Sequence, residues 1–225
     1  IIIIIIITII GTTINLSVGL AALALARRSG ARGSESPATT QDRGLPTTLP
    51  YWLTGAVLFI SGFTTLSYEI VWFRALRYLV GNSTYALTNI LVVFLLGLGF
   101  GALLYRPVLR RVRPERALAW SQLGIALLAL AAIGAEHWIL SHPEWSAQLS
   151  IFSATFLWQP WWKRLLINAG IAAAMMLPAT LCMGLSFPVA SRLFLGSLDR
   201  LGARVGGAYL LANLGSILGA VLAAV

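Results

Sequence analysis

Glu69 carries a carboxylate inside a long apolar stretch, and it is the first candidate for chemistry in this sequence. A charged group at mid-bilayer costs on the order of 2.5–3.5 kcal/mol on insertion scales and usually faces the protein interior. Arg74 and Arg77 follow at spacings of five and eight residues, and either side chain is long enough to reach back towards Glu69. Two interpretations stay open: a proton or cation site, for instance for a polyamine, or a structural ion pair or hydrogen bond between helices.

Three amides lie in other apolar stretches, namely Asn89, Asn168 and Asn213. Each is expected to hydrogen-bond across helices, which contributes on the order of 0.6 kcal/mol in a membrane. The alternative is a ligand site that they line together with Glu69.

The sequence offers little other chemistry. His137 and His142 flank the end of one apolar stretch, where a pigment or metal ligand is conceivable but an interfacial role is commoner. The single cysteine, Cys182, excludes an intrachain disulfide framework and a cysteine zinc site. Neither a nucleophile elbow, nor a phosphate-binding loop, nor a zinc-protease motif is present. We therefore expect no enzyme in these residues, no metal and no cofactor, while a bound lipid or pigment stays open.

The composition defines the elements that must position these residues. Of the 225 residues 58% are apolar and 10% are charged, against about 25% charged in an ordinary soluble domain. A bilayer core about 30 Å thick needs about 20 apolar residues in a helix. Because backbone groups in lipid must pair internally, we predict an all-α transmembrane bundle. Its six spans are Ile1–Ala26, Trp52–Phe73, Tyr85–Tyr105, Ala117–Trp138, Leu165–Phe187 and Val205–Val225.

Glycines four residues apart predict close helix packing. This spacing occurs three times, in the pairs Gly97/Gly101, Gly202/Gly206 and Gly215/Gly219. Pro178 and Pro188 are expected to bend or end the fifth span.

The connections carry the orientation signal. Cytoplasmic loops are enriched in Lys and Arg, and here the arginines concentrate in the connections after the first, third and fifth spans. These connections hold Arg27, Arg28, Arg32, Arg43, Arg106, Arg110, Arg111, Arg113, Arg116, Arg192, Arg200 and Arg204, against Arg74, Arg77, Lys163 and Arg164 on the other side. The sequence thus predicts a multi-pass membrane protein with the arginine-rich loops in the cytoplasm and both ends outside. The net charge of +9 indicates orientation rather than nucleic-acid binding.

Three regions follow. Residues 1–26 form an amino-terminal span, 27–50 a flexible linker rich in Gly, Ser, Thr and Pro, and 51–225 a five-helix bundle. An external interfacial segment is expected near 139–164. Trp72 is expected at the outer interface, in line with the aromatic belt.

Several motifs together resemble one family. They are Ser61-Gly62-Phe63, Leu66 to Arg74, Gly81 to Leu87, Leu96 to Gly101, Leu177 to Pro188, and Gly202 to Gly219 with Tyr209, Asn213 and Gly215. From Pro50 to Val225 the chain resembles the multi-span amino-terminal region of bacterial spermidine-synthase-like proteins (polyamine aminopropyltransferases). In that family the chemistry belongs to a soluble domain, and no position here matches its catalytic motifs.

Three functions follow from these patterns. The first is a non-catalytic scaffold or accessory subunit of a larger membrane complex, for instance a photosynthetic or respiratory one, with lipids and other integral-membrane subunits as partners. The second is the membrane half of a spermidine-synthase-like aminopropyltransferase. The third is a small transporter for a cation such as a polyamine.

Overall fold

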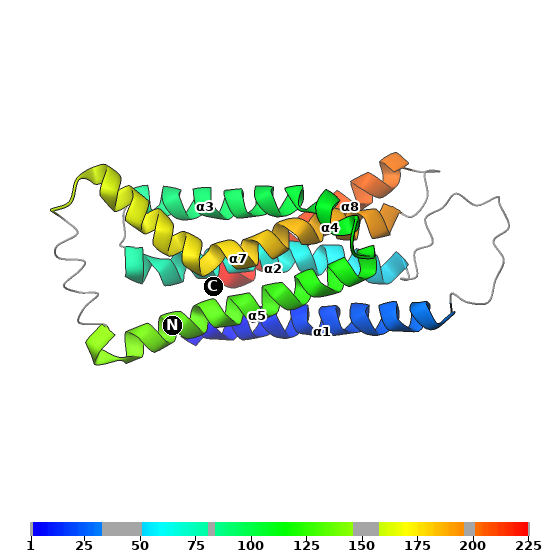
Figure 1. Cartoon of the computed structure of the whole chain (residues 1–225), viewed down its shortest axis with the longest axis horizontal. Coiled ribbons are helices and arrows are strands. Elements are labelled where there is room, and N and C mark those ends of the chain that lie inside the picture. The colour runs from blue at the N-terminus through cyan, green and yellow to red at the C-terminus, as the bar shows by residue number, and fades with distance from the viewer. Residues whose placement is uncertain (1, 33–50, 81–83, 146–157, 196–200, 225) are drawn as a thin grey trace.

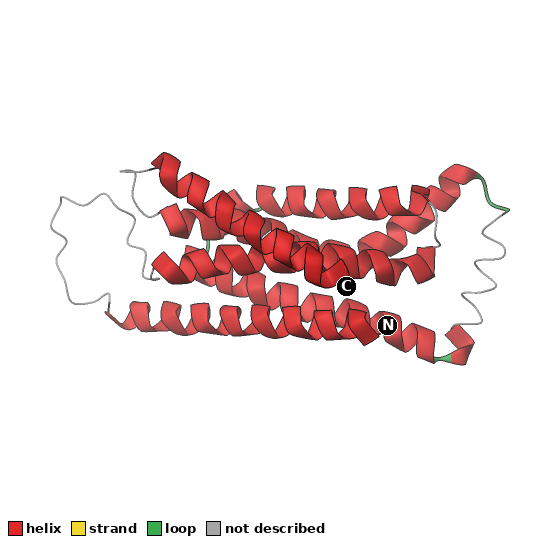
Figure 2. Cartoon of the chain, turned by 180° about the vertical axis from the view of Figure 1, so that it is seen from behind, coloured by secondary structure: helices red, strands yellow, loops and turns green. Residues whose placement is uncertain are grey.

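The chain folds into a bundle of long helices (Figure 1). The computed structural model describes residues 2–32, 51–80, 84–145, 158–195 and 201–224, and these contain no strand (Figure 2). The helices are α1 (Ile2–Arg32), α2 (Tyr51–Val80), α3 (Thr84–Leu103), the short α4 (Tyr105–Leu109), α5 (Pro114–Ser141), α7 (Trp161–Leu195) and α8 (Leu201–Ala224). The all-α bundle predicted from the sequence is confirmed.

Six of these helices are long and apolar enough to cross a membrane, as the sequence predicted. α5 shows how its ends are set. Arg113 is extended, Pro114 occupies the first turn, where its missing N–H costs nothing, and Glu115 adds a negative charge at the positive end of the helix. At the other end His142 is extended because Pro143 follows it.

α7 departs from the expected boundaries. Pro178 and Pro188 both lie inside it, and the helix continues from Trp161 to Leu195 instead of ending at Phe187. Proline removes one backbone hydrogen bond and clashes with the preceding turn. In a membrane bundle, neighbouring helices and Ser or Thr side chains compensate such losses.

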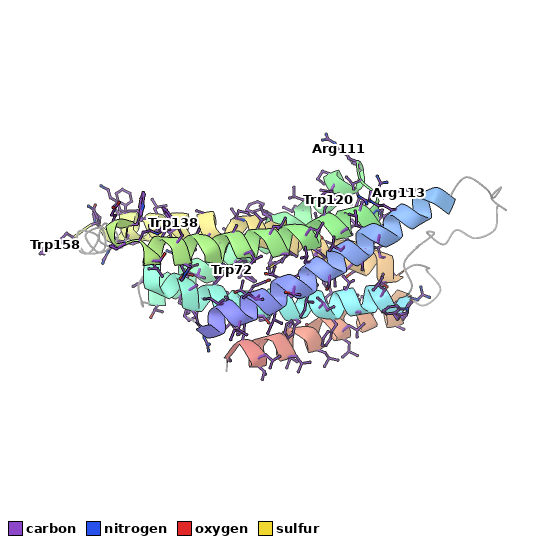
Figure 3. The ribbon with its side chains drawn as sticks, turned by 90° about the horizontal axis from the view of Figure 1, so that it is seen from below. Trp72, Arg111, Arg113, Trp120, Trp138 and Trp158 are labelled. Atoms are coloured by element: carbon purple, nitrogen blue, oxygen red, sulfur yellow. The ribbon has the colours of Figure 1, made fainter. Side chains whose placement is uncertain are left out.

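Helices that pair in space are mostly distant in sequence. α2 packs most extensively against α8, α3 against α7, and α1 against α5. Successive long helices alternate in direction along the bundle, so the carboxyl-terminal ends of α1, α3 and α7 lie at one end, together with α4 (Figure 1). Figure 3 shows Arg111, Arg113 and Trp120 at that end, with Trp138 and Trp158 at the other.

The interior contains two hydrophobic clusters. One gathers around Tyr68, Trp72 and Met176, and the other around Leu118 and Phe194. Trp72 is fully buried, so its prediction as an interfacial anchor is wrong. Its position along α2 fits an interface, but its face of the helix points into the bundle, where an indole fills a large volume.

The regional boundaries differ from those expected. α1 continues to Arg32, six residues into the predicted linker, and packs against both α5 and α2. The first helix is therefore part of one six-helix bundle. Residues 33–50, and 146–157 of the predicted interfacial segment, lie outside the described residues.

Candidate functional site

Glu69 and Arg74 do not form the ion pair that their spacing suggested. Glu69 lies half-buried on α2, and the Arg74 guanidinium donates a hydrogen bond of 2.5 Å to the carbonyl oxygen of Ala224 at the end of α8. Arg74 thus joins α2 to α8. The side chain of Arg77 lies outside the described part, so its pairing with Glu69 stays a prediction.

The three amides occupy different surroundings. Asn89 is buried on α3, and its Nδ2 donates to the carbonyl oxygen of Leu165 on α7, 3.0 Å away. This is the cross-helix bond expected for it. Asn168 is buried on α7, whereas Asn213 is exposed on α8. Because Asn213 faces outwards, the amides and Glu69 do not line one common site.

The Asn89 bond has a measurable consequence. Replacing Asn89 by leucine should lower the free energy of unfolding by about 0.6–2 kcal/mol, because the Leu165 carbonyl loses its cross-helix donor. Thr88→Val is the matched control, since the exposed Thr88 hydroxyl bonds to the Thr84 carbonyl of its own helix and to no other described residue. Unfolding in mixed micelles measures both. Equal effects of the two substitutions would contradict a specific role for Asn89.

Two of the glycine pairs lie at helix crossings. A Cβ on Gly97 would collide with Thr180 of α7, and one on Gly101 would lie 2.9 Å from the Cα of Gly184. A Cβ on Gly215 or Gly219 would collide with a carbonyl oxygen of α2.

Two hydroxyl bonds accompany the second crossing. The Ser67 hydroxyl donates to the Gly219 carbonyl at 3.1 Å, and Ser216 donates to the Gly62 carbonyl at 3.2 Å. The third pair differs, because Gly202 and Gly206 are exposed and no described atom lies within 4 Å of either Cβ position. Neither glycine of this pair therefore lies at a helix crossing among the described residues.

A hydrogen-bonded junction inside the bundle escaped the sequence analysis. Gln122 on α5 is fully buried, and its Nε2 donates to the Ser186 hydroxyl on α7 at 2.7 Å. The Ser186 hydroxyl in turn lies 3.4 Å from the Ser61 hydroxyl on α2. Gln122 could have been found, because it stands alone as an amide in the apolar stretch that became α5.

A second group of polar side chains lies on the same face of α2, two turns further along. The Tyr68 hydroxyl is 3.1 Å from the Thr12 hydroxyl of α1, and three residues further along α1 the buried Asn15 donates from its Nδ2 to the Gly11 carbonyl. Trp72 stacks on Tyr68 with 5.6 Å between ring centroids. We use the name polar junction for seven residues: Thr12, Asn15, Ser61, Tyr68, Trp72, Gln122 and Ser186.

The polar junction has unused hydrogen-bonding capacity. Asn15 Oδ1, Gln122 Oε1 and Trp72 Nε1 are buried and have no partner among the described residues. An unpaired buried polar group is costly, and each such group calls for an explanation such as a bound molecule. Two of the three atoms are acceptors and one is a donor.

The titratable residues do not assemble a metal centre. Among the described residues no three His, Cys, Asp or Glu side chains lie together as a metal site. His142 lies beyond the end of α5, where its Nδ1 is 2.8 Å from the Trp138 carbonyl oxygen, and His137 is exposed.

Comparisons with known proteins returned no match: no family model, no curated protein and no solved structure is similar to this chain. The resemblance to the membrane region of spermidine-synthase-like proteins therefore stays a prediction, as does a polyamine site at Glu69.

Proposed function

We propose that the chain is a non-catalytic accessory or scaffold subunit of a larger integral-membrane complex, and that it docks through the outer face of α8. The proposal rests on the position of Asn213. This residue lies midway along the apolar span Gly202–Ala224, and its side chain is exposed. An amide facing hydrocarbon loses its hydrogen bonds to water, so a partner helix that supplies a donor or acceptor stabilises it.

The surroundings of Asn213 suit a neighbouring helix. Gly202, Gly206 and Tyr209 precede it by eleven, seven and four residues, which puts all four on one face of α8. The two glycines leave open space above the backbone, so a second helix can approach closely. Ile217 continues the same face and is 60% exposed.

The same reasoning places the protein among other membrane proteins. We assign it to a bacterial cytoplasmic membrane, with the arginine-rich end of the bundle in the cytoplasm, because Lys and Arg are enriched there. Its partners are lipids and integral-membrane subunits, with no role for nucleic acid.

Asn213→Leu tests this proposal. The protein is isolated in mild detergent from its native membrane, and co-purified integral-membrane subunits are quantified. We expect a stoichiometric partner with the unmodified chain and a severalfold loss with Asn213→Leu, since leucine cannot replace the amide bond across the interface. Leu127→Ala, which truncates an exposed residue of α5, is the control and should retain the partner. A lone monomer from native membranes, or equal recovery with both variants, would disprove docking through α8.

A further inference from the structure

The six long helices form two units of three helices each. Each helix of the first unit runs in the opposite direction to the corresponding helix of the second (Figure 1). The first comprises α1, α2 and α3, and the second α5, α7 and α8 (Figure 1). Exchanging α1 with α5, α2 with α7 and α3 with α8 reproduces the main contacts between the long helices. The α1–α2 contact becomes α5–α7, α2–α8 becomes α7–α3, and α2–α3 becomes α7–α8, and all of these contacts occur. The α1–α5 and α2–α7 contacts map onto themselves.

The correspondence extends to single residues. At the α2–α8 crossing, a Cβ on Gly62 would collide with the Ala212 carbonyl, and a Cβ on Gly215 with the Phe59 carbonyl. Each helix therefore presents a glycine to a carbonyl of the other.

The α3–α7 crossing repeats this arrangement. A Cβ on Gly184 would collide with the Leu98 carbonyl, and a Cβ on Gly101 with the Leu181 carbonyl. The two α7 residues follow their α2 counterparts Gly62 and Phe59 by 122 positions each. In the same way, Gly215 and Ala212 of α8 follow Gly101 and Leu98 of α3 by 114 positions each. A fixed offset for each pair of helices therefore relates the two crossings residue by residue.

Such a pair of units is an inverted-topology repeat, with a pseudo-two-fold axis in the membrane plane. In membrane proteins built this way, binding sites lie near the middle of the bilayer where the two repeats meet. Rocking of one repeat against the other opens the site to each side in turn.

The polar junction lies at this meeting surface. The contact between the Ser61 hydroxyl of the first unit and the Ser186 hydroxyl of the second crosses between the units, and Gln122 supports Ser186 from within the second unit. Ser61 and Tyr68 flank the midpoint of the span Tyr51–Leu76 and are about 10 Å apart at 1.5 Å rise per residue.

We propose that the polar junction is a binding site for a small uncharged molecule with several hydrogen-bond donors, which passes between the two sides of the membrane. The unpaired Gln122 Oε1 accepts from it at the level of Ser61, and two turns or more further along α2 the unpaired Asn15 Oδ1 accepts from it and the unpaired Trp72 Nε1 donates to it. Every hydrogen bond described for the junction joins uncharged groups, so an ion would enter without a counter-charge, at a high desolvation cost.

Uptake into vesicles tests the site. The full chain is reconstituted in liposomes, and entry of radiolabelled glycerol and urea is compared with protein-free liposomes, with potassium as the charged probe. We expect severalfold faster entry of at least one uncharged probe and no added entry of potassium. Gln122→Met keeps the side-chain length, removes the amide, and should return the rate to that of protein-free liposomes.

Leu127→Ala is the matched control, because it truncates an exposed side chain on the helix that carries Gln122 and should leave uptake unchanged. Should Gln122→Met fail to fold, Ser61→Ala serves instead, since Ser61 is the contact from the opposite unit. Unchanged uptake in the folded junction variant, an equal loss with Leu127→Ala, or no uptake above protein-free liposomes would each overturn the proposal. None of these outcomes bears on docking through α8, which is measured by partner recovery.

Discussion

Gly101→Val is expected to destabilise the bundle at or above the upper end of the about 1–3 kcal/mol that overpacking costs. The reason is that a Cβ at this position meets backbone, namely the Leu181 carbonyl and the Gly184 Cα at 2.9 Å. Backbone atoms cannot rotate away as a side chain does, so α3 and α7 must separate. We expect a marked loss of monodisperse protein and a lower melting temperature in detergent.

Gly99→Val provides a closely matched control. Gly99 lies two residues away on the same helix, is exposed, and has no described atom within 4 Å of its Cβ position. The same side chain added there should leave the melting temperature nearly unchanged. Equal destabilisation by both substitutions would show that helix propensity, rather than the α3–α7 crossing, decides the outcome.

Labelling of single cysteines should give an all-or-none result for orientation. In a Cys182→Ala background, cysteine is introduced at Arg111 or at Trp158, two exposed positions at opposite ends of the bundle (Figure 3). A membrane-impermeant maleimide added to intact spheroplasts should label the Trp158 variant only. The reason is the excess of arginine at the Arg111 end, which favours retention in the cytoplasm.

Permeabilised spheroplasts are the control, because both cysteines should then react. Labelling of the Arg111 variant in intact spheroplasts would reverse the predicted orientation. It would leave the fold unaffected, since the arrangement of the helices does not depend on which end faces the cytoplasm.

The number and approximate position of the helices were predictable because a lipid bilayer permits few other backbone structures. Long apolar segments have no other way to pair their backbone groups in lipid, and all six appear. Boundaries were less accurate. α1 continues to Arg32, and α7 continues through Pro178 and Pro188. An apolar composition indicates which residues lie in lipid, but a helix can extend beyond those residues.

Which face of a helix points inwards was not predictable without the partners. Trp72 was expected at the interface and is buried, whereas Gly202 and Gly206 share the spacing of Gly97 and Gly101 but face open space. In a membrane span both faces are apolar, so no amphipathic pattern distinguishes them. For the same reason the polar junction was missed: Ser61, Gln122 and Ser186 come from three helices, and only packing brings them together.

The pairing of α2 with α8 has a consequence for synthesis. The Ser216 hydroxyl that bonds the Gly62 carbonyl is 154 residues further along the chain. At about 5–20 residues per second, the ribosome delivers it on the order of ten seconds after its partner. During that interval the glycine face of α2 stays uncovered in the bilayer. Until α8 arrives this face is open to lipid or to other helices, so we expect assembly to be sensitive to the interval between the insertion of α2 and that of α8.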